Sequence, residues 1–217
     1  IIEELSKRAS TEIVIFGHNT LSVQFDAPVV STGFPINSQA YGLFWERIIL
    51  PKVAAKYNID ILYSPNANAP AYRTPFKNVI TYHDVNALAG YADKKYKLLR
   101  KLLVPRSLAR ADRVVTVSEF SKSEILSYFD ISEKKLCVIH NGIDPLYLSD
   151  GQGEQIDLPD KFILFTGSLN PRKNISGVIE AYERFRNEYS DEYELVLVGP
   201  SNKSIFKEFE VNASEHI

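Results

Sequence analysis

Apolar and polar positions follow two different periods along the chain, with short apolar runs alternating with longer segments of helical spacing. Runs such as "VVTV", "FILF" and "LVLV" are apolar at consecutive positions, which is typical of strands covered on both faces. The pattern predicts strands at residues 12–16, 59–63, 78–82, 113–117, 136–140, 161–166 and 192–198. It predicts helices at residues 38–57, 93–110, 119–129, 175–189 and 203–211. This alternation predicts an α/β protein with parallel sheets.

Two prolines and one polar stretch divide this pattern. Pro51 and Pro105 lack a backbone N–H, so we expect each to kink or end its helix. The polar stretch "SDGQGEQIDLPD" precedes a fresh strand–turn–helix pattern. We therefore expect one domain at 1–148, a linker at 149–160 and a second domain beginning at 161 and incomplete at 217. Ligands of open parallel sheets bind beyond the carboxyl ends of the strands, so the loops after the strands are the candidate sites.

Composition narrows the class of protein. A net charge of −2 over 217 residues gives no sign of a nucleic-acid footprint spread over the whole chain. Cys137 is the only cysteine, which excludes an internal disulfide, and its apolar neighbours predict a buried, inert thiol. No apolar run reaches the ~20 residues of a membrane span, and no signal peptide is recognised, so we expect a cytoplasmic protein. Both ends read as parts of helices, and we expect a chain truncated at both ends.

One segment, residues 91–113, departs from the average charge. It carries eight cations against two acids, while the rest of the chain has 17 cations against 25 acids. Its leucines give it an apolar face, and a basic amphipathic helix of this kind binds anionic lipid. The alternative is a core helix with a solvated basic face.

Polar residues follow two of the predicted strands. His83 and Asp84 follow strand 78–82, where an imidazole can bond to a sugar hydroxyl or a phosphate oxygen. The alternative is a structural pair that holds the loop. Ser118 follows strand 113–117 and is placed to cap the next helix, whose first-turn amides can also hold an anion.

The stretch "GSLNPRKN" at residues 167–174 places two cations between a strand and a helix. Asn174 is a candidate N-cap for the helix at 175, whose positive dipole end favours an anion. Lys173 and Arg172 are suited to bind phosphate, although a solvated basic turn is the alternative. No Walker-type loop and no dinucleotide fingerprint are present.

These loops, in this order, resemble the family-four glycosyltransferases, which have the GT-B fold. The similar segments are "SPNANAPAY", "VITYHDV", "ADRVVTVSEFSKSEI", "VIHNGID" and "ILFTGSLNPRKNISGVIEAY". The resemblance implies two Rossmann-like domains facing across a cleft, the second only partly present here. It implies transfer of a sugar from a nucleotide-sugar donor with retention at the anomeric carbon, with no metal ion or other cofactor.

The resemblance also assigns roles to residues. His83 corresponds to the histidine that reaches toward the donor sugar and phosphate, and Lys173 to the lysine that binds the donor diphosphate and stabilises the leaving group. Gly167 matches the glycine that lets the backbone approach the phosphates, with Ser168 and Arg172 as further diphosphate contacts. Candidate contacts with donor or acceptor are Asp84, Ser118, Asn141 and Gly142.

The sequence departs from the family pattern at two points. Many members carry arginine where this chain has Ser168, and Arg172 is the candidate to replace it. The family's E-x7-E motif is absent, because Glu180 and Glu188 have its spacing but lie in the first helix of the second domain. We therefore expect the 217 residues alone to be inactive.

The "LFWERIILPK" and "GSLNPRKN" variants are most similar to the family's bacterial polysaccharide branch, which includes many mannosyl- and rhamnosyltransferases. We expect a hexosyltransferase that uses a GDP- or UDP-sugar to elongate a surface polysaccharide on a lipid-linked acceptor, at the inner face of the plasma membrane. Two alternatives stay open. One is another GT-B enzyme, such as a nucleotide-sugar epimerase or a phosphorylase, and the other is a non-catalytic sugar- or nucleotide-binding module.

Overall fold

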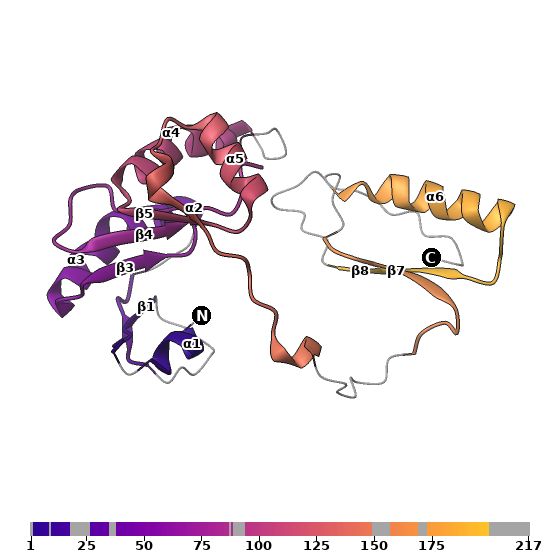
Figure 1. Cartoon of the computed structure of the whole chain (residues 1–217), viewed down its shortest axis with the longest axis horizontal. Helices are drawn as coiled ribbons and strands as arrows, with labels where there is room; N and C mark the ends of the chain where they lie inside the picture. Colours follow the sequence, from indigo (N-terminus) through magenta and orange to yellow (C-terminus); the bar gives the residue numbers. More distant parts are fainter. Residues whose placement is uncertain are drawn as a thin grey trace. The chain divides into compact units, whose positions relative to one another are not determined.

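The computed structural model describes residues 2–8, 10–17, 27–34, 38–86, 88, 94–148, 157–168 and 173–199 (Figure 1). Its elements are, in order, α1 (Ile2–Ser6), β1 (Ile15–Gly17), β2 (Val29–Ser31), α2 (Gln39–Phe44), η1 (Trp45–Ile49), α3 (Leu50–Ala54), η2 (Ala55–Tyr57), β3 (Ile61–Ser64), β4 (Lys77–Thr81), α4 (Lys94–Arg110), β5 (Arg113–Thr116), α5 (Glu119–Tyr128), η3 (Glu133–Lys135), β6 (Leu136–Val138), η4 (Pro145–Leu148), β7 (Phe162–Thr166), α6 (Ile175–Glu188) and β8 (Glu194–Val198). The described strands pair in parallel, which confirms the predicted α/β class with parallel sheets.

The chain divides into two compact units. The first holds Ile1–Val85 and Leu99–Asn141, and the second holds Asn86–Leu98 and Gly142–Ile217. The division falls within α4, which is nevertheless one continuous helix. The predicted domain boundary at 148/149 stays a prediction, and residues 149–156 of the predicted linker lie outside the described residues, as does the predicted helix 203–211.

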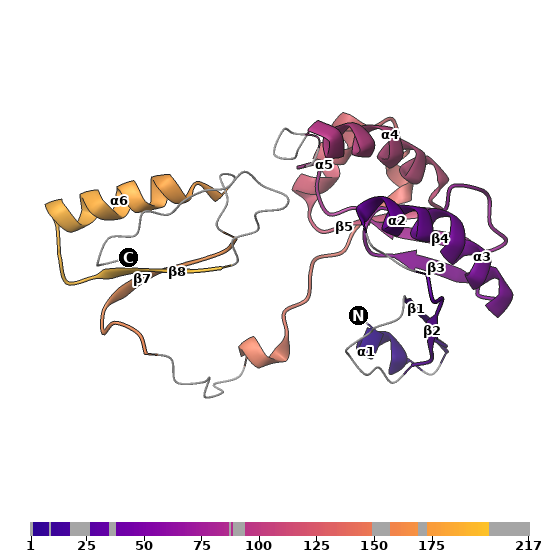
Figure 2. The ribbon, with the colours of Figure 1, turned by 180° about the vertical axis from the view of Figure 1, so that it is seen from behind.

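The four-stranded sheet of the first unit has the order β3-β4-β5-β6. Neighbouring strands in this sheet are parallel, so the loops that follow the strands all lie at the same edge of the sheet, the carboxyl edge. Figure 1 shows α4 and α5 alongside the strands, and the view from behind shows α2 and α3 crossing in front of them (Figure 2). A separate parallel pair, β1-β2, includes a strand at Val29–Ser31 that the hydrophobic pattern did not predict, because it is only three residues long.

The predicted helix 38–57 changes geometry partway. A π-helical segment, η1, lies between α2 and α3, and Pro51 stands at the start of α3. Because Pro51 has no N–H, the carbonyl of Arg47 has no helical donor four residues on, and the Ala71 N–H supplies one at 2.9 Å. The Ile48 carbonyl accepts from the Tyr72 hydroxyl at 3.1 Å. Two carbonyls therefore tie the helix to the loop after β3, and the missing N–H of Pro51 accounts for the first of them.

One apolar cluster joins this helical segment to β3. Its buried members are Trp45, Leu50, Ala54, Leu62 and Phe76. The indole N–H of Trp45 donates to Thr32 Oγ1 at 2.7 Å, so the polar edge of the ring is also satisfied.

A buried arginine joins the same segment to α4. Arg47 is 7% exposed, and its Nη1 donates to Ser107 Oγ at 2.5 Å. Burial is the main cause that lowers the pKa of Arg47 below its ordinary value, and the neighbouring cations Arg110, Arg106 and Arg100 add to it. This guanidinium is costly to bury, so its bond to Ser107 matters for stability.

α4 packs as a core helix. Val104 and Leu108 are buried on its inner side. Of the two outcomes expected for Pro105, a kink or a helix end, the structure excludes the end, because the helix continues through the proline. Its basic residues 101, 106 and 110 are exposed, as both a solvated basic face and a lipid-binding face require. Among the described residues, no helix is both long enough and apolar enough to cross a membrane.

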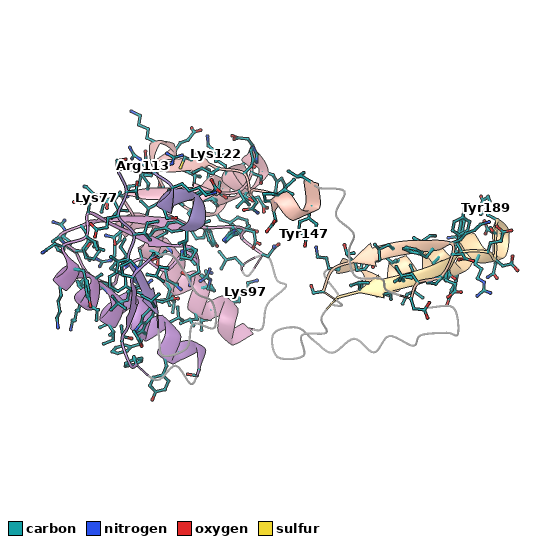
Figure 3. The ribbon with its side chains drawn as sticks, turned by 90° about the horizontal axis from the view of Figure 1, so that it is seen from below. Lys77, Lys97, Arg113, Lys122, Tyr147 and Tyr189 are labelled. Atoms are coloured by element: carbon teal, nitrogen blue, oxygen red, sulfur yellow. The ribbon has the colours of Figure 1, made fainter. Side chains whose placement is uncertain are left out.

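The amino ends of β4 and β5 are held together by Asp112. This carboxylate accepts from the Asn78 backbone N–H and from Lys77 Nζ, both at 2.9 Å. The Asn78 N–H is the main cause that holds the pKa of Asp112 below its ordinary value, and Lys77 contributes further. Lys77 and Arg113, the first residues of the two strands, are labelled in Figure 3. This edge is opposite the one at which the loops after the strands open.

In the second unit, α6 lies along the β7-β8 pair (Figure 1). Ile175 and Tyr182 are its buried residues, and the Tyr182 hydroxyl donates to the Tyr193 carbonyl at 2.9 Å. Phe185 stacks on Tyr189, whose side chain is 78% exposed at the end of the helix (Figure 3).

Two burial predictions were wrong. Cys137 is exposed, because it lies on β6, the last strand in the order of its sheet. The run "FILF" was expected to be covered on both faces, yet Phe162, Ile163 and Leu164 of β7 are 36%, 40% and 53% exposed. In the described part of this unit, the sheet has two strands and α6 beside it.

Candidate active site

His83 lies at the carboxyl edge of the four-stranded sheet, two residues beyond the end of β4. Its Nε2 is 3.1 Å from the Pro65 carbonyl, which belongs to the loop after β3. A carbonyl oxygen can only accept, so Nε2 carries the hydrogen and Nδ1 is the acceptor whenever the ring is neutral. His83 and Asp84 are both exposed. Sequence reasoning considered a structural His–Asp pair; the structure shows His83 bonded to this carbonyl, and the pair with Asp84 stays a prediction.

Glu46 positions the loop that offers this carbonyl. Its carboxylate oxygens accept from the side-chain amides of Asn66, at 2.6 Å, and of Asn68. Asn68 is buried within the loop. A buried side-chain amide without a hydrogen-bond partner would be destabilising, and the Glu46 carboxylate supplies that partner. Sequence reasoning missed Glu46, because the contact joins residues about twenty positions apart.

A second histidine has the corresponding place after β6. His140 Nδ1 donates to the Val117 carbonyl at 3.1 Å, and Val117 lies at the end of the neighbouring β5. Both histidines are therefore held by the strand end beside them, each through one ring nitrogen. Asn141 and Gly142 follow His140 and are exposed. Sequence reasoning singled out these two and missed His140, although its position at the end of the predicted strand 136–140 was a usable signal.

Ser118 follows β5 and caps α5. Its Oγ accepts from the Ser121 N–H at 3.0 Å and lies 3.1 Å from Ser121 Oγ. The predicted N-cap is therefore confirmed. Its role as a substrate contact stays a prediction.

The second group of candidate residues lies after β7. Gly167 has φ +152°, a conformation that L side chains rarely adopt, and it is followed by half-buried Ser168. The side chain of Lys173 returns to this turn, because a Cβ at position 167 would lie 4.0 Å from Lys173 Cε. Lys173 is exposed. The turn thus brings a lysine next to glycine backbone; Arg172 lies outside the described residues.

Gly199, at the end of β8, fixes the position of this turn. The Gly167 N–H donates to the Val198 carbonyl at 2.9 Å. A Cβ at position 199 would lie 1.7 Å from the Gly167 carbonyl oxygen and 3.3 Å from the Ser168 nitrogen. No side chain fits there while the strand ends keep this spacing. Sequence reasoning missed Gly199, because only the pairing of β7 with β8 reveals the contact.

The start of α6 differs from its prediction. Asn174 occupies the N-cap position, as predicted, but it has φ +53° and its side chain makes no capping hydrogen bond. The side chain lies over Gly177 instead, where a Cβ would be 2.5 Å from Asn174 Nδ2. The positive end of the helix dipole therefore lies beside Lys173 without a side-chain cap.

Chemically, the turn after β7 is suited to an anion such as a diphosphate. A lysine, glycine backbone and a helix N-terminus converge there, and all three favour negative charge. The edge after β4, β5 and β6 offers imidazole, hydroxyl and amide groups suited to sugar hydroxyls.

A sequence comparison identifies the family of these loops. The family described as Glycosyltransferase Family 4 matches residues 1–146. The chain belongs to glycosyltransferase family 4. The predicted resemblance is thereby confirmed for the region that contains His83, Ser118 and Asn141, whereas Lys173 lies beyond the matched residues.

Curated relatives are bacterial glycosyltransferases. The chain is 28% identical over 178 residues to the O-antigen chain mannosyltransferase B of Escherichia coli, covering 76% of this chain and 45% of that protein. It is 28% identical over 148 residues to the serotype-specific mannosyltransferase WbdA of Escherichia coli, covering 62% of this chain and 18% of that protein.

A third relative comes from Campylobacter jejuni. It is the N-acetylgalactosamine-N,N'-diacetylbacillosaminyl-diphospho-undecaprenol 4-alpha-N-acetylgalactosaminyltransferase, 32% identical over 102 residues, covering 47% of this chain and 27% of that protein. The chain thus spans less than half the length of each of these relatives. A solved glycosyltransferase from Rickettsia africae aligns with a TM-score of 0.40 and 14% identity, covering 81% of this chain and 56% of that one.

Proposed function

We propose that this chain is part of a retaining hexosyltransferase that moves a sugar from a GDP- or UDP-sugar to a growing bacterial surface polysaccharide. The observation that carries the proposal is Lys173 beside Gly167 at the carboxyl end of β7, in a chain of glycosyltransferase family 4. The names of the Escherichia coli relatives support mannose as the sugar, and that of the Campylobacter relative supports an acceptor linked to a polyprenyl diphosphate.

In this proposal, the loop after β7 binds the donor diphosphate. Lys173 places a point charge on the phosphate oxygens, and the Gly167 turn lets them approach the backbone at the N-terminus of α6. When the glycosidic bond of the donor breaks, negative charge grows on the leaving diphosphate, and a cation already in place stabilises it. No metal ion is needed for this step. Ser168 and Arg172 are further proposed contacts.

In this proposal, His83 contacts the donor sugar. Since its Nε2–H is engaged by the Pro65 carbonyl, the neutral ring presents Nδ1 as an acceptor for a sugar hydroxyl. Asp84, Ser118, Asn141 and Gly142 are proposed donor or acceptor contacts at the same edge. An acceptor anchored in lipid would place the enzyme in the cytoplasm, peripheral to the inner face of the plasma membrane.

The experiment incubates the full-length enzyme with GDP- and UDP-sugars, with and without a polyprenyl diphosphate oligosaccharide, and analyses the products. The proposal expects a lengthened oligosaccharide and free nucleoside diphosphate, formed only when the acceptor is present. A changed sugar without acceptor would identify an epimerase. Sugar phosphate released from the oligosaccharide after inorganic phosphate is added, with one glycosidic bond cleaved for each phosphate consumed, would identify a phosphorylase. Tight nucleotide-sugar binding without any turnover would favour a binding module.

A further inference from the structure

α4 has an outward face that its packing does not explain. Val104, Ser107 and Leu108 are buried on the inner side, each at most 1% exposed. On the outer side, Leu98 is 60% exposed and Leu102 is 51% exposed. Two leucines one turn apart in solvent are unusual on a helix whose inner side already supplies the core contacts.

These leucines belong to a longer stripe. With 3.6 residues per turn, Leu98, Leu102, Pro105 and Ala109 fall within roughly 60° of one another around the helix axis. Pro105 and Ala109 are exposed as well. The stripe therefore presents four apolar side chains in a row over three turns of one continuous helix, and we call it the apolar stripe of α4.

Cations flank the stripe on both sides. Lys101 precedes it around the helix axis, and Arg106 and Arg110 follow it, all three exposed. Arg106 Nη1 donates to the Leu102 carbonyl at 2.5 Å, so this guanidinium lies back along the helix beside Leu102. In all, the sequence of α4 has seven cations and no acidic residue.

We propose that the apolar stripe of α4 and its flanking cations dock on an anionic lipid surface. Leucine side chains at the boundary between headgroups and acyl chains, with lysine and arginine reaching the lipid phosphates, are what holds an interfacial helix. The charge pattern decides between occupants: an ordinary solvated face has no leucines at its centre, and an apolar protein contact has no need of the cations. The proposal rests on the proposed function, because a lipid-linked acceptor lies in such a surface.

The experiment is co-sedimentation of the chain with phosphatidylcholine vesicles that contain or lack phosphatidylglycerol. The chain is expected to bind only the anionic vesicles. Lys101→Gln with Arg106→Gln should weaken binding about thirtyfold, since each cation near an anionic surface contributes roughly fivefold. Leu98→Ser with Leu102→Ser should weaken it by about tenfold or more. Lys52→Gln with Lys56→Gln, an equal loss of exposed charge on α3 and η2, should have little effect.

Three outcomes overturn the proposal. One is that the wild-type chain does not bind anionic vesicles. Another is that the variant with Leu98→Ser and Leu102→Ser binds them as well as the wild-type chain does. The third is self-association in the absence of vesicles that the leucine pair abolishes, which would make a second copy the occupant. Circular dichroism confirms that the variants fold. Donor turnover on a water-soluble acceptor, measured with the full-length enzyme, tests the proposed function separately, because the stripe variants should retain it.

Discussion

The turn that carries Lys173 is predicted to depend on the absence of a side chain at position 199. In Gly199→Ala, the new Cβ would begin 1.7 Å from the Gly167 carbonyl oxygen and 2.5 Å from its carbonyl carbon. Ordinary van der Waals contact is twice that first distance, so the ends of β7 and β8 must separate. The hydrogen bond from the Gly167 N–H to the Val198 carbonyl is then lost or lengthened.

The magnitude follows from two contributions. Forcing extra atoms into packed structure costs about 1–3 kcal/mol, and the lost hydrogen bond costs about 1 kcal/mol. A local destabilisation of about 2–4 kcal/mol raises the hydrogen-exchange rate of the Gly167 amide roughly 30- to 1,000-fold if that amide exchanges through local opening.

Hydrogen exchange read by NMR measures this opening directly. Gly142→Ala is the matched control, because a Cβ there meets nothing within 4 Å. Trp45 is the only tryptophan and lies in the other unit, so its unfolding transition should stay unchanged in Gly199→Ala. If Gly167 exchanged at the wild-type rate in Gly199→Ala, the close approach of the two strand ends would be refuted.

Two further predictions concern the first unit. Ser107→Ala leaves the buried Arg47 guanidinium without its hydroxyl partner and should lower the unfolding free energy by about 1–3 kcal/mol. Arg47→Met removes the buried charge itself and should lower the unfolding free energy by less. Urea unfolding followed by Trp45 fluorescence compares the two variants, and a larger loss in Arg47→Met than in Ser107→Ala would contradict the account. In the folded state, the pKa of Asp112 is lowered relative to an ordinary value of 3.8. The ionised carboxylate therefore stabilises the folded state above that pH, and this stabilisation is lost as pH falls through the folded pKa. Asp112→Asn should therefore lower the urea midpoint at neutral pH and lose this difference in acid; an equal difference at both pH values would argue against the assignment.

Local sequence patterns predicted the elements well where each element has its own signal. The alternation of apolar runs with helical spacing found the strands of two of the three described sheets, β3-β4-β5-β6 and β7-β8. Ser118 was correctly placed as a cap because capping depends on neighbouring residues. Pro51 was correctly expected to disturb its helix, but a pattern of spacing cannot reveal that the disturbance takes the form of a π-helical segment.

The errors arose where the outcome depends on residues far apart in the sequence. An apolar run shows that a strand can be covered, but not what covers it, which is why the exposure of Cys137 and of β7 was missed. Glu46, His140 and Gly199 gain their significance from partners on other strands or loops. The apolar stripe of α4 could be separated from the core side of that helix only after Val104 and Leu108 were seen to be buried.

The central claim is that Lys173 binds the donor diphosphate and stabilises it as the leaving group. The most direct test is kcat/KM for the donor in the full-length enzyme carrying Lys173→Ala. Lys161→Ala is the matched control, since Lys161 is an exposed lysine of the same unit at the opposite end of β7, paired with Glu192. The account predicts that kcat/KM falls about 100- to 1,000-fold in Lys173→Ala, with little change in Lys161→Ala. An unchanged kcat/KM in Lys173→Ala, or an equal loss in both variants, would contradict it.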